Sequence, residues 1–432
     1  MQQATRRTGI PIRYALVFWL LVISAVAYLD RTNLSVAGIE ITREFSISNT
    51  RLGWLQSAFL IGYAGFQIPA GVLARRLGPR LVLVVAGLWW ALFTALTAVV
   101  SPHAGQALLL LILVRFGLGA GEAPMYPATS QFVERWFPVK ERGKANGIIF
   151  AGVGLGSGLS QPLVAAIILH YGWRASFGVS AGIGAIAGLV WWLASRDAPE
   201  DHAAVSPAEL AQIVAGRREA AAAARRKVPW SSIFRCRGIL AMTLSYFTYG
   251  YVAWIFFAWM YIYMATARGV NLKGSAIDAM LLPLAMTVGC LLGGVLCDRI
   301  TARFGLRIGR CVVPSVAFAL TAVLLLAGSR AHAESTAVLL LACGAGSLYL
   351  AQSSYWAVCA DLAGEFTSVV AGMVNMGGQI GGAVTASLTP LIAAHFGWQT
   401  SFLTAAVLAL MGGLAWLTVD PTRPLVSAAD RN

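Results

Sequence analysis

Apolar stretches of roughly 20 residues recur along the whole chain and constrain its fold more than any other feature. A helix of that length crosses the hydrocarbon core of a lipid bilayer. The stretches are continuous rather than alternating, which excludes a transmembrane β-barrel. Twelve spans are predicted, at about residues 13–37, 51–74, 81–101, 107–133, 144–168, 175–195, 237–264, 276–298, 311–329, 335–360, 368–393 and 400–419.

The composition agrees with a membrane protein. Hydrophobic residues make up 58% of the 432 and charged residues only 12%, whereas a soluble domain carries about 25% charged residues. The sequence therefore predicts an all-α polytopic membrane protein with twelve transmembrane helices in contact with the lipid bilayer.

The distribution of Lys and Arg predicts the orientation. With the N-terminus inside, 24 of the 32 basic residues fall in inside segments and six fall outside, while Arg31 and Arg115 lie within spans. An excess of basic residues marks cytoplasmic loops. Both termini are therefore expected in the cytoplasm, which for a bacterial protein means an inner-membrane, multi-pass location.

The net charge of +14 follows from the same loops and gives no indication of nucleic-acid binding. The six cysteines lack metal-ligand spacing and are interpreted as apolar packing residues. No nucleophile and base recur at a spacing typical of catalysis, and the five histidines scatter to loops and span ends. We therefore expect no enzyme, no catalytic residue, no metal and no cofactor.

The chain divides into two similar halves. A hydrophilic segment at 196–236 separates six spans from six, and sequence echoes cross it. "HYGWRASF" at 170–177 returns as "HFGWQTSF" at 395–402, and "GVLARRLG" at 71–78 returns as "GVLCDRIT" at 294–301. Parallel repeats of six spans are typical of transporters that bind substrate between two halves. We expect an N-terminal six-helix half over 1–195, a cytoplasmic central loop over 196–236 and a C-terminal six-helix half over 237–432.

Four ionisable residues fall inside predicted spans: Asp30 and Arg31 in the first, Arg115 and Glu122 in the fourth. Each charge costs about 2.5–3.5 kcal/mol at a bilayer centre, so such residues usually serve a function, although structural ion pairing is the alternative. Counting along the two antiparallel spans places both arginines about 10–12 Å below the outer boundary. Two guanidiniums at one depth can bind a carboxylate.

The two acids suggest proton coupling. A guanidinium stabilises a nearby carboxylate, and an anion that occupies the guanidinium removes that stabilisation and favours protonation. Binding of anion and proton would then promote one another. Arg31 is the expected substrate ligand, and Asp30 and Glu122 are the expected proton carriers.

The residues resemble a known family. The motifs are "YLDRTNLSVA" at 28–37, "FLIGYAGFQIPAG" at 59–71, "RFGLGAGEAPMYPA" at 115–128, "WFPVKERGKANG" at 136–147 and "GMVNMGGQIGG" at 372–382. Together they resemble the major facilitator superfamily and, within it, the anion:cation symporter family of organic-anion permeases.

This resemblance implies roles for several residues. It assigns substrate contact to Arg31, pocket positions to Tyr28 and Tyr63, and a substrate or gating role to Arg115. The polar patch of the eleventh span supplies Asn375 and Gln379 as further substrate-binding candidates. Proton coupling is assigned to Glu122 and Asp30.

The inner-loop signature of the superfamily departs from its pattern in one copy. An acid is expected after "GxxA", but Arg75 stands there, while the second copy keeps Asp298. The acid-mediated latch between the halves is therefore in doubt for the first copy. Asp298, with Arg76 and Arg299, is predicted to govern gating, and Asp298 is expected to matter more than position 75.

The expected function is proton-coupled import of an organic carboxylate by a monomeric transporter. Sugar acids of the hexuronate, glucarate or galactonate type are the leading substrates. The aromatic seventh span and Val153, where some sugar-acid carriers have a polar residue, keep aromatic carboxylates of the phthalate or hydroxyphenylacetate type open. Organic-anion exchange is the other alternative, although it requires no intramembrane acid.

Overall fold

The computed structural model describes residues 11–216, 228–259, 263, 275–423 and 425, apart from residues 48 and 104. Parts of the predicted central loop and of the seventh span, together with Arg268 and Lys273, lie outside the described residues. The helices that precede the central loop are α1 (Ile12–Glu44), α2 (Asn49–Leu77), α3 (Pro79–Val99), α4 (Ala107–Glu122), α5 (Met125–Trp136), η1 (Val139–Glu141) and α6 (Arg142–Ala194).

The remaining elements are also helices, and the described part of the chain contains no strand. In and around the central segment lie η2 (Pro199–Asp201), α7 (Pro207–Gly216) and α8 (Trp230–Arg235). The second half contains α9 (Arg237–Trp254), η4 (Ile255–Trp259), α11 (Ser275–Phe304), α12 (Leu306–Arg330), α13 (Glu334–Leu350), α14 (Gln352–Ala363), η5 (Gly364–Phe366), α15 (Thr367–Phe396), α16 (Trp398–Ala415) and η6 (Trp416–Thr418).

Ten stretches of the described residues are long and apolar enough to span a membrane. The difference from the predicted twelve arises where one continuous stretch holds two predicted spans. α6 contains 144–168 and all but the last residue of 175–195, and the stretch Glu334–Ala386 contains 335–360 and most of 368–393. The 53 residues of α6 would extend about 80 Å as one helix, far beyond a hydrocarbon core of about 30 Å.

Glycines with positive φ make the reversals between spans. Gly172 interrupts α6 with φ 79° and ψ 165°, and Gly397 separates α15 from α16 with φ 80° and ψ 162°. Gly78 directly follows α2 with φ 87°, and Gly305 directly follows α11 with φ 89°. A side chain would be strained in that region. The first echo therefore contains an equivalent glycine turn in each copy, whereas the second echo ends at Gly78 in one copy and precedes Gly305 by four residues in the other.

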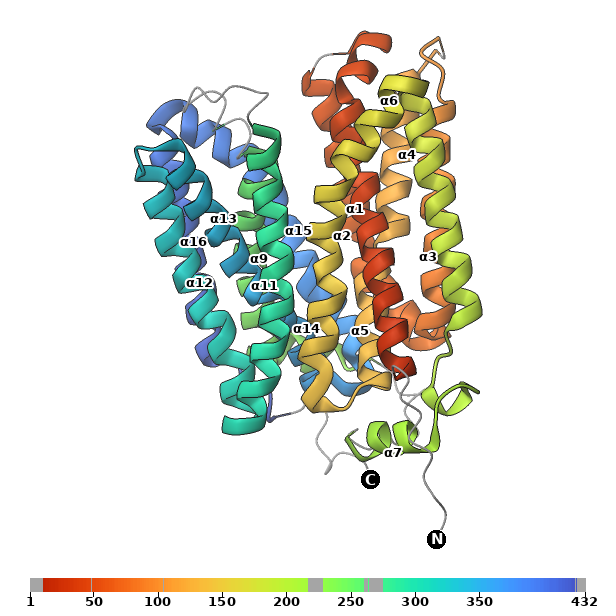
Figure 1. Ribbon diagram of the computed structural model, residues 1–432, viewed down its shortest axis with the longest axis vertical. Coiled ribbons are helices and arrows are strands. Elements are labelled where there is room, and N and C mark those ends of the chain that lie inside the picture. The colour runs from red at the N-terminus through yellow and green to blue at the C-terminus, as the bar shows by residue number, and fades with distance from the viewer. Residues whose placement is uncertain are drawn as a thin grey trace.

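The helices form two groups, α1–α6 and α9–α16, that run side by side (Figure 1). Their long axes converge at the end that holds α7 and diverge toward the other end. We call the end where they converge the α7 end. There Glu209 of α7 accepts hydrogen bonds from the backbone N–H groups of Ile12, at 3.1 Å, and Arg13, at 3.0 Å. These are amides that the first turn of α1 cannot satisfy itself.

Large apolar side chains cover much of the outer surface. Leu169 is 82% exposed, Val99 75% and Leu193 67%. A soluble monomer rarely exposes apolar patches on this scale, whereas a bilayer covers them. The chain is an all-α, multi-pass membrane protein.

Candidate functional site

An ion pair lies between α1 and α4 in the interior of the N-terminal group. Arg31 donates to Glu122 Oε2 through Nε at 3.1 Å and Nη2 at 3.0 Å. The Glu122 side chain is 1% exposed and the Arg31 side chain 14% exposed. The second oxygen of Glu122 is buried without a hydrogen-bond partner. The two groups therefore hold one another while Arg31 keeps a solvent-reachable side.

Aromatic rings surround the Arg31 guanidinium. Its central carbon lies 4.6 Å from the ring centroid of Tyr28, 4.8 Å from that of Tyr63 and 5.2 Å from that of Phe59. Rings at these distances attract a cation through their electron-rich faces. Tyr28 and Tyr63 were predicted from the sequence and Phe59 was not, although it lies four residues before Tyr63 and thus on the same helix face.

Arg115 and Asp30 are less exposed than Arg31. The Arg115 guanidinium carbon is 5.1 Å from the Phe59 centroid, so both arginines contact one ring. Arg115 and Asp30 are 2% and 1% exposed, and the electrostatic neighbours of Asp30 include Glu122, Arg115 and Arg31. Neither oxygen of Asp30 has a hydrogen-bond partner. In this conformation Arg31, and not Arg115, is the guanidinium that solvent reaches.

Asn375 of α15 connects the second group of helices to this cluster. Its Nδ2 donates to Tyr63 Oη at 3.3 Å and to Gln67 Oε1 at 3.1 Å. Gln379 lies one turn further along α15, half-buried, with a buried Oε1 that has no partner. The sequence did not single out Gln67, which follows Tyr63 by four residues on α2.

Aromatic side chains also contact one another between the two groups of helices. Tyr28 of α1 faces Phe257 of η4 at 6.2 Å between ring centroids. Tyr126 of α5 stacks on Trp356 of α14 at 5.9 Å, and Gln352 donates to Tyr246 Oη at 3.0 Å. The C-terminal side of the interior therefore offers stacking surfaces and few charges.

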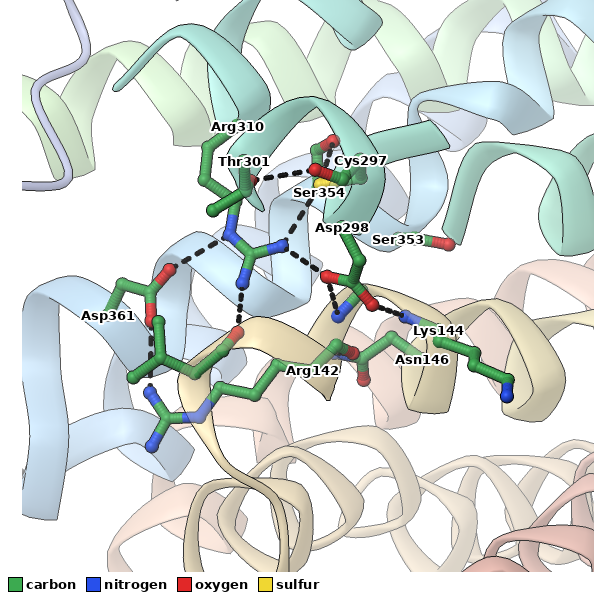
Figure 2. A network of polar contacts seen from close by, with 12 residues as sticks. Arg142, Lys144, Asn146, Cys297, Asp298, Thr301, Arg310, Ser353, Ser354 and Asp361 are labelled. Atoms are coloured by element: carbon green, nitrogen blue, oxygen red, sulfur yellow. Dashed lines mark hydrogen bonds and ion pairs between the residues drawn. The ribbon is translucent and has the colours of Figure 1, made fainter. Parts of the chain in front are cut away.

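A buried charge network closes the α7 end between the two groups of helices (Figure 2). Asp361 of α14 pairs with Arg142 of α6 at 3.0 Å and with Arg310 of α12 at 3.0 Å. Arg310 also pairs with Asp298 of α11 at 2.9 Å. Arg142, Arg310 and Asp361 are each 2% exposed or less.

Asp298 joins this network to the start of α6. Its carboxylate accepts hydrogen bonds from the backbone N–H of Gly143 at 3.0 Å and of Lys144 at 2.6 Å. The first amides of a helix lack internal partners and carry a positive partial charge, which favours an acid there. The predicted gating acid thus spans both groups of helices.

Arg75 forms a different contact at the corresponding position of the first copy. It pairs with Glu365 of η5 at 3.2 Å and its guanidinium lies 4.7 Å from the Phe366 centroid. The sequence left a latch in doubt here because an acid is missing. The structure contains an ion pair between the two groups of helices here, with the base on α2 and the acid on the opposite group, whereas the superfamily pattern expects the acid on α2. Arg76 and Arg299 are exposed and take no part in this network among the described residues.

Sequence reasoning missed most of the network, namely Arg142, Arg310, Asp361 and Glu365. One signal was present. Glu134 and Asp361 each lie two residues before the end of a twelve-residue helix, α5 and α14. Arg142 contacts both acids, at 3.8 Å and 3.0 Å. The two acids therefore occupy equivalent positions in the two halves of the chain, and this equivalence indicates that one basic residue could contact both.

The comparisons with known proteins agree with this architecture. A family model described as Major Facilitator Superfamily matches residues 20–386. A probable sulfoacetate transporter of Cupriavidus necator is 33% identical over 92% of this chain and 91% of that protein. A probable L-galactonate transporter of Escherichia coli is 30% identical over 91% and 84%. A hexuronate transporter of Bacillus subtilis is 28% identical over 95% and 94%.

Solved structures share the fold at low identity. A proton:xylose symporter bound to 6-bromo-6-deoxy-D-glucose superposes with a TM-score of 0.72 at 14% identity, over 93% of this chain and 94% of that one. A fucose:proton symporter of Escherichia coli gives 0.70 at 16% identity, over 94% and 97%. The resemblance read from the sequence motifs is confirmed: the chain belongs to the major facilitator superfamily, among its organic-anion transporters, and is not an enzyme.

Proposed function

We propose that the protein is a proton-coupled symporter that imports an organic carboxylate, with sugar acids as the leading substrate class. The family, the relatives described as a probable L-galactonate transporter and a hexuronate transporter, and the interior arginine support this proposal. The proposed unit is a monomer in which the halves 1–195 and 237–432 rock about the site, joined by the loop 196–236.

The observation that carries the proposal is the Arg31–Glu122 pair, with 3.0 Å between Nη2 and Oε2. A substrate carboxylate and ionised Glu122 compete for one guanidinium. Protonated Glu122 does not compete, because a neutral acid has lost the attraction that holds Arg31. Proton binding therefore releases Arg31 for substrate, and substrate binding favours the protonated acid, which is reciprocal coupling.

Asp30 is the proposed second proton carrier. It is 1% exposed, and both of its oxygens lack hydrogen-bond partners. A buried acid in that setting is far less costly when protonated. If both acids load protons with a monoanion, one positive charge moves inward per cycle, and the membrane potential adds about 2.3 kcal/mol per 100 mV. Electroneutral uptake of a monoanion would contradict the two-proton version.

The proposed orientation places the α7 end in the cytoplasm of a bacterium, with both termini on that side of the inner membrane. The basic residues support it, because the positively charged loops gather there. The network around Asp361 then closes the cytoplasmic side, and the state described is outward-facing. Arg31, 14% exposed, would receive substrate from outside.

Proton uptake in proteoliposomes tests the function. Addition of the transported acid to wild-type vesicles is expected to draw protons in, and Glu122→Gln is expected to abolish this. The amide of that variant cannot take up a proton, yet Arg31 stays free to bind substrate, so exchange of labelled for unlabelled substrate should persist. Glu334→Gln, at an exposed acid in the first turn of α13, is the matched control. Equal loss of net uptake and exchange would make Glu122 a structural residue.

Aromatic carboxylates are the second candidate class, because the aromatic contacts of Tyr28 with Phe257 and of Tyr126 with Trp356 lie between the two groups of helices. The substrate panel therefore includes sugar acids, phthalate, hydroxyphenylacetate and sulfoacetate. A class that draws protons into wild-type vesicles identifies the substrate. A panel that binds and exchanges without proton movement would favour anion exchange instead.

A further inference from the structure

A lateral groove opens on the membrane-facing side of the N-terminal helices, away from the transport site. It has a volume of about 270 Å³ and lies between α2, α3 and the junction of α4 and α5. Its exposed walls are apolar and come from Phe66, Leu73, Leu77, Leu81, Val85 and Trp89. Gly121 at its floor leaves room for the Trp89 ring, which a side chain there would displace.

A basic residue that is not part of the lining lies close to one end of the groove. Leu77 and Leu81 flank the reversal at Gly78, where α2 meets α3, and Arg76 lies in the last turn of α2. Leu73 and Arg76 are three residues apart and therefore neighbours on the helix surface. Arg76 is exposed, and no acid among the described residues pairs with it. The apolar groove therefore begins close to a positive charge that has no acidic partner among the described residues, at the edge of the hydrocarbon layer.

We propose that this groove binds an anionic glycerophospholipid, with an acyl chain between α2 and α3 and the phosphate on Arg76. The walls match a hydrocarbon chain because no charged side chain lines them. A basic residue at the membrane surface attracts an anionic headgroup. The site gives Arg76 a function distinct from the gating role predicted from the sequence, and it does not depend on the proposed transport activity.

The groove also lies behind a helix that the rest of the molecule uses. α2 supplies Tyr63 and Gln67 to the central cluster and Arg75 to the α7 end. A bound chain would fill the space behind α2 and limit its movement toward α3. Lipid occupancy therefore acts on the helix that contacts α15.

The test is lipid retention by the full chain, measured by native mass spectrometry after exchange into phosphatidylglycerol or phosphatidylethanolamine. The wild type should keep one phosphatidylglycerol more strongly than phosphatidylethanolamine. Arg76→Gln should weaken phosphatidylglycerol retention by about fivefold, the factor expected for one basic residue at an anionic surface. Arg299→Gln is the matched control, because Arg299 is the exposed equivalent of Arg76 in the second copy.

A second pair of variants tests the groove itself. Val85→Trp fills it from its rim, where Val85 is 53% exposed, and should reduce retention of either lipid. Leu88→Trp, at a residue 51% exposed on α3 outside the groove, should not. Equal effects of Arg76→Gln and Arg299→Gln, or unchanged retention in Val85→Trp, would overturn the proposal. Equal retention of the two lipids by the wild type would overturn the headgroup assignment.

Discussion

Asp361→Asn tests whether the buried network holds the α7 end closed. Asp361 bridges Arg142 and Arg310 at 3.0 Å each, and the three side chains are almost fully buried. Removing one partner of a buried ion pair costs about 3–5 kcal/mol. Arg310 keeps Asp298 at 2.9 Å and Arg142 keeps Glu134 at 3.8 Å, so the lower limit applies. About 3 kcal/mol corresponds to roughly 100-fold in the ratio of open to closed forms.

Cys297 offers a native reporter of this opening. It is 0% exposed and its Sγ accepts a hydrogen bond from Arg310 at 3.1 Å inside the network. A maleimide can reach it only when the α7 end opens, so its labelling rate follows the open population. The assay measures labelling of each cysteine by peptide mass spectrometry in proteoliposomes. We expect Cys297 to react about 100-fold faster in Asp361→Asn, because loss of about 3 kcal/mol shifts the equilibrium between the closed and open forms by that factor.

Two comparisons separate gate opening from other effects. Cys290, also 0% exposed, lies two helical turns further from the α7 end where α11 packs on α6, so it should gain less reactivity than Cys297, and equal gains at both would indicate unfolding. Asp420→Asn removes an exposed pair with Arg423, which is 87% exposed, and should change little, because such pairs contribute about 0–1 kcal/mol. A Cys297 rate within about threefold of wild type in Asp361→Asn, an energy well under the 3 kcal/mol expected, would refute the assignment of this network as the closure.

The other predictions concern single ion pairs. Arg75→Glu places a second acid beside Glu365 and should raise Cys297 labelling. The double variant Arg75→Glu with Glu365→Arg should return the labelling to the wild-type rate, because it rebuilds the 3.2 Å pair in reverse. A double variant that labels as fast as Arg75→Glu would show that the pair does not hold the α7 end closed. At the end of the molecule opposite the α7 end, the hydrogen bond from Arg174 holds the pKa of Glu44 below its ordinary value of 4.5. Its stabilising contribution should be complete above that value and vanish as pH falls through the lower folded value. The difference in Tm between wild type and Glu44→Gln should therefore be present near neutral pH and disappear in acid, and a pH-independent difference would contradict this.

The fold could be predicted because its determinants are local. Span length, basic loops and repeated turns depend on residues close together in the chain, as Gly172 and Gly397 illustrate with φ values of 79° and 80°. Counting residues from the span ends also predicted that Arg31 and Arg115 lie at similar depth, and both contact Phe59. Depth follows from rise per residue alone.

The side-chain partners could not be predicted in the same way. Depth counting does not give helix rotation, so the sequence could not show that Glu122 binds Arg31 while Arg115 lies buried. The Arg142–Asp361 pair joins residues 219 positions apart, on helices whose proximity depends on the conformational state. The motif around Arg75 could not show its pair with Glu365, because the two residues are 290 positions apart in the chain.

The contact between α2 and α15 joins the central cluster to the closed end. Tyr63, Gln67, Gly71 and Arg75 follow one another every four residues, and therefore form one stripe on α2. Tyr63 and Gln67 contact Asn375, Gly71 O accepts a hydrogen bond from Ser368 Oγ at 2.6 Å, and Arg75 pairs with Glu365. A side chain at Gly71 would collide with the Ser368 carbonyl, so the two helices touch at backbone distance. In the mechanism that we propose, a substrate that draws Tyr63 or Gln67 away from Asn375 would release the central end of this stripe. The helix would pass that displacement to Arg75, because packed helices move as units and not residue by residue. In this proposal α2 itself links substrate binding at the central cluster to the contacts that close the α7 end, and no separate pathway is needed.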